Sequence, residues 1–161
     1  MIHRIRQITD RTLEWASLLC LSAMGTVVLI QVFARFLLPK TPAWTEEAAR
    51  MFFIFTISFA GGLAVRDHAL IGFDVLVERL PLKANRILRI VSHLIITVFM
   101  GILAWQSILF IRVGHLQTSP ILEIRMSYVF SSMLVLFLFT GIYSALEAAT
   151  LLRKIRQPVR T

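Results

Sequence analysis

Four long apolar runs constrain what this chain can fold into. They cover about residues 13–38, 45–65, 87–111 and 126–152 of a 161-residue chain. A helix that crosses a bilayer needs about 20 mostly apolar residues, and each run has that length or approaches it. The mean hydropathy of +0.77 and the hydrophobic content of 57% exceed those of an ordinary soluble domain. We therefore predict an all-α integral membrane protein with four transmembrane helices in a single membrane domain, residues 1–161.

The distribution of cations predicts the topology of these helices. Twelve of the 17 Lys and Arg residues precede the first run, separate the second from the third, lie at the start of the third (Arg89), or follow the fourth. Loops on the cytoplasmic side carry such an excess, so both the N- and the C-terminus are expected in the cytoplasm. The net charge of +8 then reflects topology and attraction to anionic membrane lipid. Because the cations are dispersed around apolar spans, we expect no nucleic-acid binding.

The longest segment between spans, residues 66–86, has its own pattern. Phe73, Leu76, Val77 and Leu80 recur at helical spacing, as in a helix that lies in the membrane interface. Pro81 would end that helix, since proline disfavours a helical conformation at the residue before it. We predict a short amphipathic interfacial helix over about 70–80 in a cytoplasmic loop. An ordinary connector without a partner is the alternative.

Charged residues flank the turn between the first two spans. The segment "FARFLLPKTPAWTEEAARMFF" places Arg35 near the end of one span and Glu46, Glu47 and Arg50 at the start of the next. Thr45 is a candidate N-cap, and acids in the first helical turn suit the positive end of the helix dipole. Charges at membrane depth are costly unless they are paired or reach the interface. We expect either a paired cluster that joins the two helices or separate side chains that extend to the surface.

Trp44, beside this cluster, fits an interfacial anchor in both cases. The four charged groups lie near one membrane surface, whereas carriers tend to bind substrate near the midplane. Only mild polar groups, such as Ser58, Thr97 and Thr140, fall near the centre of the spans. The sequence therefore favours a supporting role over a transport site in this chain.

The sequence offers no pattern typical of an enzyme. His3, His68, His93 and His115 are scattered, and the single cysteine, Cys20, rules out an internal disulfide. His93 is expected to be a hydrogen-bonded packing residue. Gly61 and Gly62 lie inside the second span, where small residues allow helices to approach closely. We expect no catalytic residues, no metal ligands and no cofactor in this chain.

Four motifs together resemble one transporter family. They are "VFARF" at the end of the first span, "WTEEAARMFFIF" at the start of the second, "GGLAVRDHALIGFDVLVERLP" across the following loop, and "QTSPILEIRMSY" before the fourth span. In order and spacing they are similar to the small membrane subunit, the DctQ-type or Q subunit, of tripartite ATP-independent periplasmic (TRAP) transporters. The resemblance covers nearly the whole chain.

The resemblance implies a function that the residues alone do not. In this family a periplasmic binding protein delivers a small organic anion, often a carboxylate, to a large membrane subunit that moves it by a sodium-driven elevator motion. The small subunit braces the large one and helps to dock the binding protein. It would hold no sodium itself, since sodium is expected in the large subunit. The expected location is the cytoplasmic (inner) membrane of a bacterium or archaeon.

Carried over residue by residue, the motifs imply structural or interface roles and no catalytic ones. The matching positions are Arg35, Trp44, Glu46, Glu47 and Arg50 near the outer surface, and His68, Asp74 and Pro81 in the inner loop. Two other classes are alternatives. A stand-alone homo-oligomeric four-helix carrier or channel would need a titratable group near the midplane, and a membrane-anchored enzyme subunit would need a cluster of ligands or a nucleophile.

Overall fold

The protein is described by a computed structural model in which residues 2–38, 42–67 and 82–156 are placed. The helices are α1 (Ile2–Leu37), α2 (Ala43–Arg66), α4 (Leu82–Gly114) and α5 (Met126–Arg156). Each contains a stretch that is long and apolar enough to cross a membrane. This confirms the predicted all-α, four-span fold. The interfacial helix predicted for about 70–80 lies outside the described residues.

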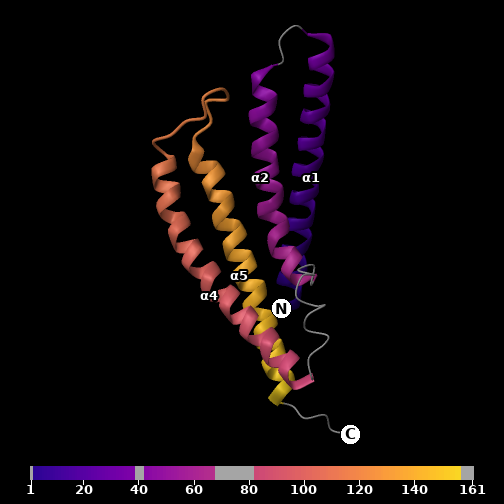
Figure 1. Ribbon diagram of the computed structural model, residues 1–161, viewed down its shortest axis with the longest axis vertical. Coiled ribbons are helices and arrows are strands. Elements are labelled where there is room, and N and C mark those ends of the chain that lie inside the picture. Colours follow the sequence, from indigo (N-terminus) through magenta and orange to yellow (C-terminus); the bar gives the residue numbers. More distant parts are fainter. Residues whose placement is uncertain (1, 39–41, 68–81, 157–161) are drawn as a thin grey trace.

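The helices form two antiparallel hairpins that diverge from one end of the molecule (Figure 1). α1 packs on α2, α2 packs on α5, and α5 packs on α4. The beginning of α1, the end of α2, the beginning of α4 and the end of α5 lie at the same end, here called the terminal end. The opposite end, here called the loop end, carries the α4–α5 loop, residues 115–125.

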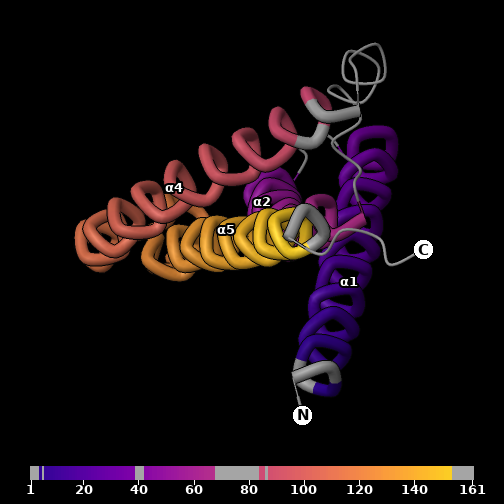
Figure 2. Tube along the Cα trace, turned by 90° about the horizontal axis from the view of Figure 1, so that it is seen from below, coloured from indigo at the N-terminus to yellow at the C-terminus, as the bar shows by residue number. Residues whose placement is uncertain are grey.

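Helix α1 is tilted against the other three helices. Seen from below, its N-terminal end extends away from α2, α4 and α5 (Figure 2). It also starts near residue 2, whereas hydropathy placed the first span at about 13–38. The additional turns carry charged residues such as Arg4, Asp10 and Arg11, which lower hydropathy but do not oppose helix formation.

Helix α2 begins earlier than its sequence indicated. Pro42, with φ −65°, occupies the N-cap position, so the expectation that Thr45 caps the helix is wrong. Thr45 lies in the first turn, where it is fully buried and its hydroxyl donates to the carbonyl of Pro42 at 2.7 Å. A proline suits a helix start because its φ is already helical and its missing N–H would have no partner there.

The core is small and lies where α1, α2 and α5 converge. Leu13, Leu63, Val65 and Tyr143 are buried together, and Phe59 and Phe139 pack against them. Gly62 allows the close approach of α2 and α5, since a Cβ there would lie 2.8 Å from the Phe139 Cβ. The role predicted for the Gly61–Gly62 pair is therefore confirmed.

Large apolar side chains cover much of the outside. On α4 they include Ile95, Phe99 and Trp105, all more than half exposed. In a bilayer such a surface faces lipid or another membrane subunit. Because the exterior is largely apolar, the polar contacts between helices are the candidates for functional positions.

Candidate functional site: two polar clamps

The first cluster, here called the Glu47 clamp, joins α2 to the α4–α5 loop at the loop end. The carboxylate of Glu47 accepts a hydrogen bond from the hydroxyl of Ser119 and another, at 2.9 Å, from the backbone N–H of Leu122. Ser119 is buried, with only 1% of its surface exposed. Hydrogen bonds to an ionised acceptor are stronger than neutral ones, so Glu47 links the two hairpins at the end where they diverge.

The α4–α5 loop presents these donors because its backbone is itself hydrogen-bonded. The N–H of Ser119 donates to the carbonyl of Ile124 at 2.9 Å, and the N–H of Met126 donates to that of Gln117 at 2.9 Å. Glu123 adopts a positive φ of 53°, which closes the turn. A loop fixed in this way can hold Glu47 without losing much conformational freedom on contact.

The other charges predicted at this end are only partly brought together. Glu46 pairs with Arg50 at 3.4 Å, but both side chains are about 70% exposed, so the pair contributes little. Arg35 is exposed in the last turn of α1 and forms no ion pair within the described part of the chain. The hypothesis of one four-residue cluster joining the first two helices therefore does not describe this geometry.

The reason for the difference is the geometry of α2. Successive residues on an α-helix point about 100° apart, so Glu46 and Glu47 cannot both face the same neighbour. α2 lies between α1 and α5, and Glu47 is on the side of the α4–α5 loop. Trp44, at the start of α2, is 43% exposed, as an interfacial anchor would be.

The second cluster, here called the Arg66 clamp, lies at the terminal end. The guanidinium of Arg66 is 2.9 Å from a carboxylate oxygen of Glu14, 3.4 Å from one of Asp10 and 2.7 Å from one of Asp67. The Arg66 side chain is 20% exposed and that of Asp10 is 15% exposed. A partly buried cation with three acidic partners is far better compensated than an exposed pair.

Helix α5 joins the Arg66 clamp through Tyr143. Its hydroxyl donates a hydrogen bond to Asp10, and the guanidinium carbon of Arg6 lies 5.9 Å from the centre of its ring. That distance is within the range of a cation–π interaction. The clamp therefore connects α1, α2 and α5 at the point where these helices converge.

Sequence reasoning did not identify Asp10, Arg66, Tyr143 or Ser119 as site residues. One signal was present: Asp10 and Glu14 are four residues apart, so both lie on one face of α1. In an antiparallel pair, the start of α1 meets the end of α2, where Arg66 lies. By contrast, His68, Asp74 and Pro81 lie outside the described residues.

A third polar contact joins α4 to α5. The Nδ1 of His93 lies 3.0 Å from the hydroxyl of Ser144, and this hydroxyl also lies 3.0 Å from the carbonyl oxygen of His93. This confirms His93 as a hydrogen-bonded packing residue. Within the described residues no three His, Cys, Asp or Glu side chains are grouped so that they could hold a metal ion.

Comparison with known proteins places this architecture in a family. Residues 24–154 match the profile of the family described as "Tripartite ATP-independent periplasmic transporters, DctQ component". The match covers most of the chain. The chain belongs to this family. It is therefore a small permease subunit of a TRAP transporter and a multi-pass protein of the bacterial inner membrane.

Two relatives support the assignment to the DctQ family. The chain is 26% identical over 127 residues to a Haemophilus influenzae protein named "Putative TRAP transporter small permease protein", covering 79% of this chain and 77% of that one. It is 31% identical over 83 residues to the "Isethionate TRAP transporter permease protein DctMQ" of Oleidesulfovibrio alaskensis, covering 50% of this chain and 13% of that protein. The family is a transporter component and not an enzyme family.

Proposed function

We propose that this DctQ-type subunit braces a large TRAP membrane subunit and helps to dock a periplasmic binding protein during sodium-driven uptake of an organic acid. The Glu47 clamp is the observation that carries this proposal. It fixes the α4–α5 loop to the start of α2 through an ionised group with two donors. A brace must keep its shape while its partner moves, and charge-assisted hydrogen bonds between hairpins provide that rigidity.

The second relative supports the same partner. Its printed name, DctMQ, joins the two membrane components, and this chain covers only 13% of it. A segment that is part of one polypeptide with a larger permease has that permease as its neighbour. We infer that the exposed apolar faces of this subunit contact the large subunit in addition to lipid, and that sodium binds in the large subunit.

The terminal end is proposed to face the cytoplasm and the loop end the periplasm. The excess of Lys and Arg before α1, between α2 and α4 and after α5 supports this orientation. The ordered α4–α5 loop would then be exposed on the side from which a binding protein approaches. His68, Asp74 and Pro81 would contribute to the cytoplasmic loop in structural or interface roles.

The test compares Glu47→Gln with Glu46→Gln. Glutamine keeps the size of Glu47 but removes the charge and turns an amide donor toward Ser119 or Leu122. The loss of about 1.5 kcal/mol for a hydrogen bond to a charged group corresponds to roughly a tenfold shift of the subunit from the clamped to the unclamped arrangement. We therefore expect Glu47→Gln to lower both the yield of complex with the large subunit and substrate uptake in cells.

Glu46→Gln is the matched control, because its carboxylate is exposed and its pair with Arg50 contributes little. Complex yield and uptake should stay near the wild-type level. Wild-type assembly and transport with Glu47→Gln would exclude the Glu47 clamp as a bracing element. The alternative function, a stand-alone homo-oligomeric carrier or channel, would be supported if the purified chain alone moved solute into liposomes.

A further inference from the structure

One exposed face of α1 carries an ordered series of side chains. Arg4, Ile8, Arg11, Trp15 and Leu18 follow one another at spacings of four, three, four and three residues, which places them on a single helical face. All five are exposed, with Ile8 at 63%, Trp15 at 65% and Leu18 at 57%. This face, here called the α1 stripe, begins at the terminal end and extends into the apolar part of α1.

The order of the side chains corresponds to the layers of a membrane leaflet. The two arginines come first, Trp15 follows, and an aliphatic side chain comes last. Tryptophan prefers the level of the headgroups, and leucine prefers the hydrocarbon region. From Arg11 to Trp15 the helix rises roughly 6 Å, which is close to the thickness of one headgroup layer, about 5–7 Å.

The charged side chains of the α1 stripe itself are two arginines, Arg4 and Arg11. Asp10 and Glu14 are engaged by Arg66. Within the described residues, neither Arg4 nor Arg11 forms a salt bridge or a hydrogen bond through its side chain. Two exposed guanidinium groups that have no acidic partner among the described residues, at the edge of an apolar span, favour an anion and in particular a phosphate.

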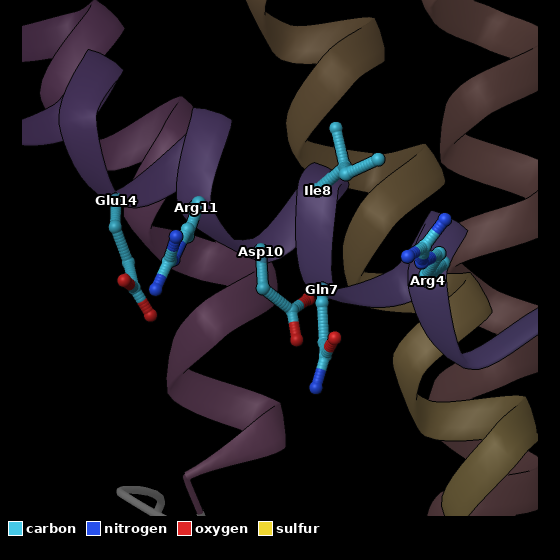
Figure 3. Close-up of a pocket in the computed structure, with 6 residues that line it drawn as sticks. All are labelled: Arg4, Gln7, Ile8, Asp10, Arg11 and Glu14. Atoms are coloured by element: carbon cyan, nitrogen blue, oxygen red, sulfur yellow. The ribbon is translucent and has the colours of Figure 1, made fainter.

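A cavity lies beside these residues. It has a volume of about 550 Å³, and its described lining consists of Arg4, Gln7, Ile8, Asp10, Arg11 and Glu14. In Figure 3, the side chains of Gln7, Asp10, Arg11 and Glu14 extend toward the same side of α1. The cavity therefore combines two cations, an amide, an apolar side chain and the two carboxylates that pair with Arg66. This lining is suited to an amphiphile whose polar head is held by the two arginines.

We propose that the α1 stripe binds an anionic phospholipid, with Arg4 and Arg11 on the headgroup phosphate and the acyl chains along Trp15 and Leu18. Basic pockets at the cytoplasmic ends of transmembrane helices recognise anionic lipids in this way. A free phosphate ion would satisfy the arginines equally well but would not use the apolar half of the stripe. Bound lipid would therefore place acyl chains against Trp15, whereas a bound phosphate ion would not.

The test uses Trp15 as its reporter. The double substitution Trp44→Phe and Trp105→Phe leaves Trp15 as the remaining tryptophan of the three in the chain. The full-length protein is placed in nanodiscs of phosphatidylethanolamine containing phosphatidylglycerol, with one of the two lipids brominated on its acyl chains. We expect brominated phosphatidylglycerol to quench Trp15 at a much lower mole fraction than brominated phosphatidylethanolamine.

Arg4→Gln together with Arg11→Gln should abolish this preference. Each cation near an anionic surface strengthens the binding of anionic lipid about fivefold. Removing both arginines should therefore lower the preference for phosphatidylglycerol roughly 25-fold. The matched control is Arg112→Gln together with Arg125→Gln, which removes the same charge from exposed arginines of the loop end. The control should keep the preference for phosphatidylglycerol shown by the parent protein, which is the Trp44→Phe, Trp105→Phe variant.

Three results would overturn the proposal. They are equal quenching by the two brominated lipids in the parent, an unchanged preference in the Arg4/Arg11 variant, and an equal loss in the control. Inorganic phosphate, added at constant ionic strength, distinguishes the two sources of the anion. We expect it to leave quenching unchanged, and recovery of Trp15 fluorescence would assign the arginines to free phosphate instead of lipid.

Discussion

At the scale of residues, the number of partners determines what a charge contributes. Arg66 has three acidic partners and is largely buried, whereas Arg50 has one partner and about 70% of its side chain is exposed. Removing the cation of Arg66 would leave carboxylates uncompensated near the membrane. Removing the cation of Arg50 would leave only the exposed carboxylate of Glu46, which water solvates.

We predict that Arg66→Gln lowers the stability of the subunit in detergent by about 2 kcal/mol, in the range for hydrogen bonds to charged groups. Thermal unfolding followed by circular dichroism measures the effect. Arg50→Gln is the control and should change stability by at most about 0.5 kcal/mol. Equal effects of the two substitutions would contradict the Arg66 clamp.

The residues of both clamps could be predicted only in part. Glu47 belonged to a recognisable charged motif, but its partner Ser119 is 72 positions away, and Tyr143 is 133 positions from Asp10. Spacing along one helix shows which residues share a face, but it does not show which other helix that face meets. That information depended on α2 packing between α1 and α5.

At the scale of elements, α2 is the central helix. It contacts α1 on one side and α5 on the other, and it supplies one residue to each clamp, Glu47 near its start and Arg66 at its end. Its close contact with α5 depends on a glycine. A Cβ at position 62 would meet the Cβ of Phe139 at 2.8 Å, which is too close to be relieved by rotating a side chain.

We predict that Gly62→Ala destabilises the subunit. Overpacking costs about 1–3 kcal/mol, which exceeds the gain of up to about 1 kcal/mol from replacing glycine in a helix. Gly101→Ala is the matched control, since no atom lies within 4 Å of the Cβ position there. It should leave the melting temperature unchanged or raise it, and a lower melting temperature in the control than in Gly62→Ala would contradict the packing argument.

The elements themselves were more predictable than their ends. Hydropathy located all four spans, because the cost of exposing apolar residues to water is large and accumulates over each helix. The observed start of α1 precedes the predicted one because the first turns of the helix are amphipathic and charged. The observed start of α2 also precedes the predicted one, because Pro42, and not Thr45, occupies the N-cap position.

At the scale of the whole molecule, two hairpins joined by polar clamps at opposite ends form an open assembly. The core is small, and large apolar side chains remain exposed on every described helix. Such a surface suits a subunit that is completed by its neighbours in the membrane. From the distribution of cations we propose that the terminal end faces the cytoplasm.

This orientation can be tested with the single cysteine. In a Cys20→Ser background, we predict that Glu123→Cys in the α4–α5 loop reacts with a membrane-impermeant maleimide in intact spheroplasts. Arg153→Cys, near the end of α5, should react only after the membrane is permeabilised. Both positions are exposed in the structure, so differences in labelling report the side of the membrane. The reverse pattern would invert the proposed topology.

The most direct test of the central claim is a purification of this subunit with its partners. The chain, tagged at its C-terminus, is extracted from native membranes in a mild detergent and analysed by mass spectrometry. We predict recovery of a much larger multi-span membrane protein in a near one-to-one ratio. Recovery of the chain alone, or as a homo-oligomer that moves solute across liposomes, would contradict its role as an accessory subunit.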